Sequence, residues 1–186
     1  MKKIIFTLLF ASSIILTAQE KEEKTFTLSG SVDTYFRGNI SGGNFDTAPG
    51  SSFANQPGFS LGMINLIAGY EGEKVGFVAD MVYGPRGADA VFGSPAGSAQ
   101  IVNQLYAYWN VSEKVTLTLG NFNTFLGYEV ISPTANFNYS TSYLFSYGPF
   151  SHTGIKADIA LSENTSLMLA VMNPTDATEF NPTGNY

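Results

Sequence analysis

The sequence predicts an all-β fold, a transmembrane antiparallel up-and-down β-barrel of which about seven strands are present and which does not close. Apolar and polar residues alternate with a period of two along most of the segments, as in strands whose two faces meet different surroundings. The connections between these segments are alternately long and short, as in barrels with short periplasmic turns and long outer loops. Charged residues make up only 13 % of the chain, about half the usual share.

Residues 1–18 have the features of a cleaved signal peptide. Lys2 and Lys3 form a basic end, an apolar stretch runs from Ile4 to Leu16, and small residues precede Gln19. The apolar stretch is too short for a membrane-spanning helix of about 20 residues. We therefore expect export to the outer membrane of a Gram-negative bacterium and insertion by the barrel-assembly machinery. Residues 19–24 are then a polar leader, and residues 25–186 form the partial barrel domain.

The first strand is predicted over residues 26–40 and the second over residues 58–70, with a long connection at 41–56. In the second strand the apolar phase changes along the chain, and a β-bulge near Ile64-Asn65 would reconcile its two halves. Phe59, Leu61 and Met63 share one phase, whereas Leu66, Ala68 and Tyr70 share the other. Apolar residues of the first strand alternate with a polar set: Thr27, Ser29, Ser31, Asp33, Tyr35, Arg37 and Asn39.

Five further strands follow the same pattern. They are expected at residues 75–84, at 101–111, from Val115 onward, at 153–161, and around Leu167, Leu169 and Val171. Segments 71–74, 112–114 and 162–164 are short turns, whereas 85–100 and 173–186 are loops. Apolar faces would contact outer-membrane lipid, and polar faces would line the interior. A secreted β-sandwich also alternates but has no reason to make every second connection short.

The segment 121–152 is the feature from which a function is inferred. It is rich in Asn, Ser, Tyr, Phe and Gly, and it interrupts the strand alternation. Compact domains seldom carry so long a connection without regular structure, whereas a pore can be narrowed by a loop folded into its lumen. The sequence therefore predicts a lumen loop at 121–152 in a water-filled porin that passes small hydrophilic solutes.

Residues that line the lumen or its constriction are predicted from their phase or from their place in this loop. A basic residue facing lipid at the midplane costs about 2–4 kcal/mol, so Arg37 and Lys156 should point inward or lie near a rim. Charges of both signs would then create a transverse field, unless they form internal ion pairs. The predicted set is Asp33, Arg37, Asp80, Glu129, Tyr139, His152, Lys156 and Asp158.

Neither a catalytic site nor a metal or cofactor site is expected. The chain has one histidine and no cysteine, which leaves little for a triad or a metal centre. Ser151 and His152 are adjacent, and adjacent strand residues point to opposite faces. The formal net charge of −6 without a basic cluster argues against nucleic-acid binding. A non-conducting receptor or adhesin barrel stays the main alternative and an outer-membrane hydrolase a weaker one, and a homo-oligomer stays open.

Several short motifs lie between Val115 and Asp176: Leu119-Gly120-Asn121-Phe122, Gly127-Tyr128-Glu129, Asn136-Phe137-Asn138-Tyr139-Ser140, Gly148-Pro149-Phe150 and His152-Thr153-Gly154. With them, this segment resembles the OmpL-like β-barrel porin family of Gram-negative outer membranes. The resemblance implies a passive diffusion pore, although Asn173-Pro174-Thr175-Asp176 departs from the Asn-Gly-Trp-like run of the family. Seven strands are an odd number, whereas bacterial single-chain barrels have an even number of at least 8. We therefore expect a fragment or, as the second choice, a barrel assembled from several chains.

Overall fold

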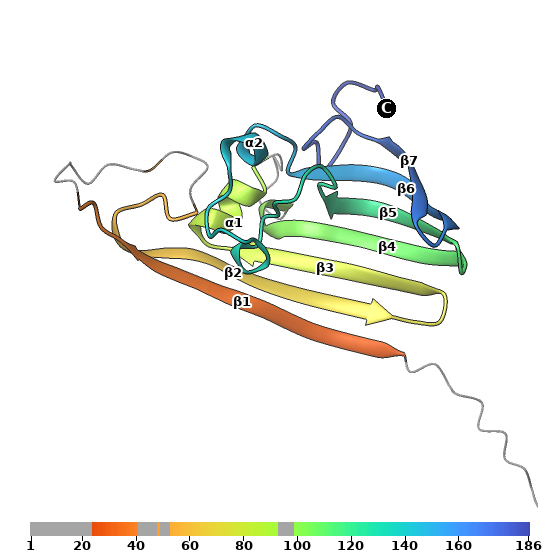
Figure 1. Ribbon diagram of the computed structural model, residues 1–186, viewed down its shortest axis with the longest axis horizontal. Helices are drawn as coiled ribbons and strands as arrows, with labels where there is room; N and C mark the ends of the chain where they lie inside the picture. Colours follow the sequence, from red (N-terminus) through yellow and green to blue (C-terminus); the bar gives the residue numbers. More distant parts are fainter. Residues whose placement is uncertain (1–23, 41–47, 49–52, 93–98) are drawn as a thin grey trace, which may run out of the picture.

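The structure is a computed structural model that describes residues 24–40, 48, 53–92 and 99–186. The expected signal peptide and all but the last residue of the leader lie outside these ranges. The described strands form one sheet in the order β1-β2-β3-β4-β5-β6-β7. Figure 1 shows the short turns at one end of this sheet and the long connections, which contain short helices, at the other. The all-β class and the up-and-down topology are therefore confirmed.

Each strand pairs antiparallel with the next one along the chain. The sheet is open, with the first and last strands as its edges, which agrees with the expected incomplete barrel. The first strand ends at Arg37, earlier than expected, whereas the fifth and sixth run on into the segment expected to be loop. The strands are β1 (Thr25–Arg37), β2 (Gly58–Glu71), β3 (Val75–Tyr83), β4 (Val102–Ser112), β5 (Val115–Asn123), β6 (Ser151–Ser162) and β7 (Thr165–Met172).

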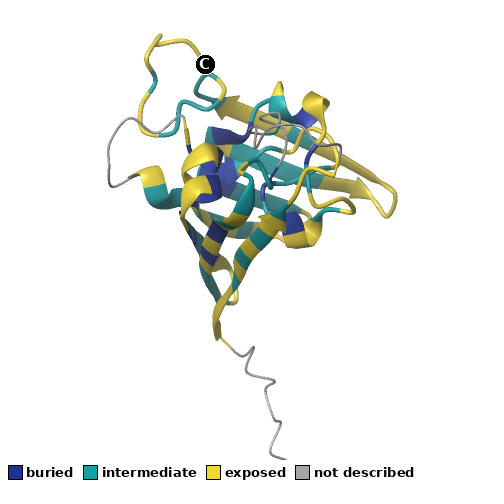
Figure 2. Cartoon of the chain, turned by 90° about the vertical axis from the view of Figure 1, so that its left-hand side faces the viewer, coloured by how far each residue is buried: buried dark blue, intermediate teal, exposed yellow. Residues whose placement is uncertain are grey.

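The two faces of the sheet differ as the alternation predicts. On the apolar face, Leu28, Val32 and Leu119 are 66 %, 76 % and 64 % exposed. In water such a continuous apolar surface would promote association, whereas in a bilayer it contacts hydrocarbon. Figure 2 shows that burial concentrates where the long connections meet the sheet, while the strand ends near the short turns stay largely exposed.

Aromatic residues mark both ends of the apolar face. Phe36 and Phe59 pack 4.8 Å apart at the end with the long connections, and Tyr70 stacks on Phe77 at 5.8 Å near the short turns. Phe26 pairs with Tyr70 across the β1–β2 ladder. Phe26 and Phe36 are ten positions apart. At about 3.3 Å per residue and a tilt of about 40°, the two aromatic rows stand about 25 Å apart, the height of a barrel's apolar band.

Two β-bulges bring additional side chains to the polar face. In β2, Gly62 and Met63 both lie opposite Asp33, because Val32 pairs with Ile64 and Thr34 with Leu61. A bulge was expected near Ile64-Asn65, and the structure has one about two residues earlier in the strand. In consequence Met63 is not on the outer face but is 2 % exposed on the inner one. The second bulge lies in β4 at Asn103, between the partners of Asp80 and Met81.

The connection after β3 was expected to be an irregular loop, but it contains α1 (Pro85–Ala90) and the 3₁₀ turn η1 (Ala99–Ile101). Pro85 suits the first helical position, where its missing N–H is not needed. α1 approaches β3 closely, because a Cβ on Gly87 would lie 3.1 Å from the backbone of Val82. Met63, Val82 and Val91 form a buried cluster there. This connection therefore folds over the polar face of the sheet.

None of the helices in the described ranges is long and apolar enough to cross a bilayer.

Candidate functional site

The candidate site lies between the polar face of the sheet and the insert, which we define as residues 124–150. β5 and β6 take up the rest of the segment 121–152 that was expected to be loop. The insert contains η2 (Pro133–Ala135) and α2 (Tyr143–Ser146), although no regular structure was expected in it. Ile131, Phe145 and Phe150 form a buried cluster with Ala90 of α1. The insert and α1 therefore pack together at the end with the long connections (Figure 1).

A tyrosine hydroxyl ties the insert to the first strand. Tyr139 Oη lies 2.8 Å from each carboxylate oxygen of Asp33, to which it donates a shared hydrogen bond. The two residues are 106 positions apart in the chain, so this contact is tertiary. Burial and the bond to Asp33 raise the pKa of Tyr139, which keeps the phenol protonated and able to donate at neutral pH. We call this contact the Tyr139–Asp33 latch.

Arg86 of α1 is buried close to the latch. It is 5 % exposed, and its guanidinium carbon lies 3.8 Å from the centre of the Phe53 ring. Its Nε and Nη2 form no hydrogen bond within the described part of the chain. Burial lowers the pKa of Arg86 to about 10, although Asp89, Tyr139 and Asp33 act in the opposite direction. Arg86 therefore stays charged at neutral pH. Sequence reasoning missed it because its segment was expected to be a loop.

Asp80 lies beneath the insert, on the polar face of β3, and is 3 % exposed. Asn65 donates a hydrogen bond to Oδ1, while Asn103 and Gln104 donate to Oδ2 at 2.8 Å and 3.1 Å. Asn103 and Gln104 are consecutive, and the bulge in β4 allows both side chains to reach the same carboxylate. No lysine, arginine or histidine of the described ranges forms an ion pair with Asp80.

A hollow of about 370 Å³ separates this part of the sheet from the insert. We call it the Asp80 hollow. Its walls include Ser29 and Ser31 of β1 and Ser132 and Thr134 of the insert. Among the described residues that line it, Asp80 alone is charged. The hollow thus has a mixed polar and apolar lining that contains the negative charge of Asp80, and the insert encloses it on one side.

The other predicted charges form separate contacts. Lys156 and Asp158 form an ion pair of 2.5 Å on β6, which is the internal pairing that was weighed against a transverse field. Lys156 Nζ also lies 5.5 Å from the centre of the Phe122 ring. At the end of β1, Arg37 donates a hydrogen bond to the carbonyl oxygen of Asn55 at 3.1 Å. These residues do not line the Asp80 hollow.

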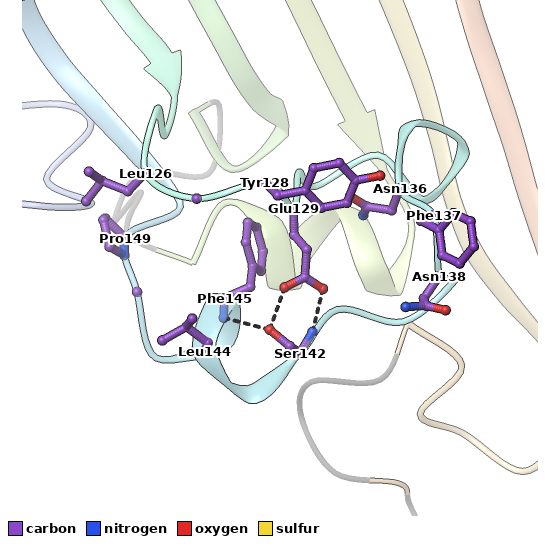
Figure 3. Close-up of a pocket in the computed structure, with 12 residues that line it drawn as sticks. Leu126, Tyr128, Glu129, Asn136, Phe137, Asn138, Ser142, Leu144, Phe145 and Pro149 are labelled. Carbon is purple, nitrogen blue, oxygen red and sulfur yellow. Dashed lines mark hydrogen bonds between the residues drawn. The ribbon is translucent and has the colours of Figure 1, made fainter.

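Glu129 forms hydrogen bonds that connect two parts of the insert. Its carboxylate accepts hydrogen bonds from the backbone N–H of Ser142 at 2.6 Å and from Ser142 Oγ at 2.5 Å. Ser142 in turn caps α2 by accepting from the N–H of Phe145 at 3.3 Å. Figure 3 shows these bonds in a second cavity of about 560 Å³, whose described lining residues all belong to the insert. Glu129 thus organises the insert and does not reach the Asp80 hollow.

His152 fixes the place where the insert rejoins the sheet. It is 5 % exposed, its ring stacks on Phe125 at 4.6 Å, and its Nε2 lies 3.2 Å from Thr124 Oγ1. Ser151 donates its backbone N–H to Asp176 at 2.9 Å. No cluster of three or more His, Cys, Asp or Glu residues within the described ranges could hold a metal ion. Of the eight predicted site residues, the structure therefore joins Asp33 with Tyr139 and Lys156 with Asp158.

Comparison with protein families gives a match over residues 25–186 to the family described as "Putative beta-barrel porin-2, OmpL-like". The matched range includes all seven strands and the insert. No curated protein and no solved structure matches the chain.

Proposed function

The chain belongs to the OmpL-like β-barrel porin-2 family, and from this premise we propose that it forms an outer-membrane porin narrowed by the insert. Small hydrophilic solutes diffuse passively through a water-filled lumen, and no chemical step is involved. The observation that carries this proposal is the position of the insert. Ile131, Ser132 and Thr134 face the polar side of strands whose opposite side is apolar and exposed.

The contrast between the two faces supports the assignment of lipid and water. Ser29 and Ser31 line the Asp80 hollow, whereas Leu28 and Val32 of the same strand lie on the exposed apolar face. A barrel wall requires this arrangement along every strand, because the hydrocarbon core accepts only apolar side chains. The latch and the cluster around Ile131 hold the insert on the polar side, where it would narrow the passage.

Cysteine modification in a planar bilayer tests the proposal. The chain has no native cysteine, so the reaction of a single introduced cysteine measures the accessibility of that one position. In Ser132→Cys, a charged methanethiosulfonate reagent should reach the thiol and reduce the conductance of the purified protein. In Leu119→Cys, the control on the exposed apolar face, the same reagent should change nothing, because lipid excludes it.

Three outcomes would contradict the proposal. A folded protein that inserts but passes no steady ion current would favour the receptor or adhesin barrel. If Ser132→Cys reacts fully without changing the current, the insert does not narrow the pathway. Reaction of Leu119→Cys with the aqueous reagent would show that its face of the sheet lies in water.

A further inference from the structure

Two side chains in the lining of the Asp80 hollow carry an acceptor atom that has no donor among the described residues. Oδ1 of Asn103 and Oδ1 of Asn123 are buried and form no hydrogen bond within the described ranges. Asn103 is 5 % exposed, and its Nδ2 donates to Asp80 at 2.8 Å. Since a carboxylate accepts only from the nitrogen of the amide, the Oδ1 of Asn103 has to point away from Asp80. Buried polar atoms are rarely left without partners, and both side chains belong to the lining of the hollow, so a hydrogen-bond donor is favoured there over a purely apolar occupant.

The charge in the hollow indicates the sign of this occupant. Asp80 is the one charged residue among the described residues of the lining, and its oxygens accept three amide hydrogen bonds. A carboxylate has about four lone-pair sites, so capacity for a further donor remains. The three amide hydrogen bonds do not neutralise the charge of Asp80. A cation would therefore be favoured in the hollow, whereas an anion would be repelled.

The size and apolar portion of the hollow argue for an organic cation. Its volume of about 370 Å³ is far larger than a bare metal ion needs and lies at the lower end for small-molecule sites. Met63, Val82 and Ile131 contribute buried apolar surface next to the polar groups. A metal ion would gain nothing from these side chains, and the described residues hold no cluster of metal ligands.

We propose that the Asp80 hollow is a binding subsite for small organic cations, in which a primary ammonium lies against Asp80. The N–H groups of the ligand would donate to Asp80 and to the Oδ1 atoms of Asn103 and Asn123, while its carbon chain contacts Met63 and Ile131. This inference deepens the proposed function, on which it rests, because it names the class of solute that the lumen retains.

Binding is tested on the protein folded in detergent micelles, which requires no conduction. Three probes of similar size differ in charge: ethanolammonium, ethylene glycol and glycolate. Titration followed by saturation-transfer NMR should show saturable binding of ethanolammonium, at least about tenfold tighter than binding of the other two. Asp80→Asn should weaken it at least about tenfold. Asp89→Asn, the same change at an exposed residue of α1 outside the hollow, should leave it unchanged.

A second variant keeps the test decisive if Asp80→Asn does not fold. Asn123→Asp adds a negative charge to the hollow without removing a donor from Asp80, and it should tighten ethanolammonium binding. Equal binding of ethylene glycol, displacement of ethanolammonium by equimolar potassium ions, or no binding to the folded protein would each overturn the inference. Asp80-dependent binding to a protein that passes no current would support the subsite and refute the porin, whereas current without binding would refute the subsite alone.

Discussion

Removal of the Tyr139 hydroxyl should loosen the insert without unfolding the sheet. In Tyr139→Phe the ring stays, so its edge contact with Phe53 at 6.0 Å is kept. What is lost is the hydrogen bond to Asp33, in which one O–H lies 2.8 Å from both oxygens. Because this bond joins segments 106 positions apart, its loss should act on the position of the insert and leave the strand pairing intact.

The expected size follows from the geometry. A hydrogen bond to a charged group is worth about 1.5–3 kcal/mol when well shielded. Tyr139 is 41 % exposed, so water replaces part of the bond, and we expect a loss of about 1–2 kcal/mol. The equilibrium constant for detachment of the insert should therefore rise about 5- to 30-fold. The buried cluster of Ile131, Phe145, Phe150 and Ala90 still opposes detachment.

Hydrogen exchange measured by mass spectrometry on the micelle-folded protein provides the assay. Peptides from residues 124–150 should exchange about 5- to 30-fold faster in Tyr139→Phe, while peptides from β3 and β4 keep their rates. Tyr143→Phe is the matched control, because Tyr143 lies in the same insert, is 58 % exposed and stacks on Tyr147. Asp33→Asn should loosen the same peptides, and the double variant should add little to either single change.

The latch would be refuted if Tyr139→Phe exchanged like the unaltered protein, or if Tyr143→Phe had the same effect. Additive effects of Tyr139→Phe and Asp33→Asn would show that the two residues act independently. Faster exchange throughout β3 and β4 would mean that Tyr139 supports the whole sheet and not only the insert.

Three further predictions concern ionisation, burial and lipid contact. Because its pKa is raised, Tyr139 should keep its proton near pH 10, where ordinary tyrosines ionise, so the latch should be fully formed below pH 10 and lost only as the pH rises through the raised pKa. Tyr139→Phe should therefore remove no tyrosinate absorbance at about pH 10.5. A lower absorbance in the variant would contradict this. Arg86→Met should raise the free energy of unfolding in urea by about 1 kcal/mol. Burial that lowers the pKa of Arg86 to about 10 disfavours the charged form by about 3 kcal/mol, whereas the contact of the guanidinium with Phe53 contributes about 2 kcal/mol of stabilisation. A clear decrease in the free energy of unfolding would show that the charge is needed. Leu119→Arg should lower the free energy of unfolding by about 2–4 kcal/mol if Leu119 lies near the bilayer midplane. Ser29→Arg, on the polar face, should change the free energy of unfolding by less than about 1 kcal/mol. Equal effects of the two variants in the same urea titration would contradict the assignment of the faces.

The strands could be predicted because their signal is local. A strand with lipid on one side and polar surroundings on the other imposes a period of two, and this period is visible in Phe26–Arg37 without knowledge of any partner. Prediction failed where the period is interrupted. Because Met63 is apolar and shares its phase with Phe59 and Leu61, the sequence placed its side chain on the outer face. Only the pairing of Val32 with Ile64 and of Thr34 with Leu61 places it inside.

The candidate site was less accessible from the sequence. Asp33, Asp80 and Tyr139 were named from their phase or segment, but nothing in the chain indicated which groups they would meet. Arg86 was not identified, because a helix of six residues that begins at a proline and contains a glycine carries no clear periodic signal. Its burial depends on Phe53, which comes from a different connection.

By itself the sequence determined the class of fold, the two faces of the strands outside the β-bulges, and the alternation of short and long connections. These follow from solvent contacts that every residue makes locally, because hydrocarbon and water select side chains one position at a time. Only the tertiary structure decided that Tyr139 meets Asp33, that three amides surround Asp80 and that Arg86 is buried. Those contacts depend on bulges and on the paths of two long connections. They join residues far apart in the chain, so they produce no periodic pattern in the sequence.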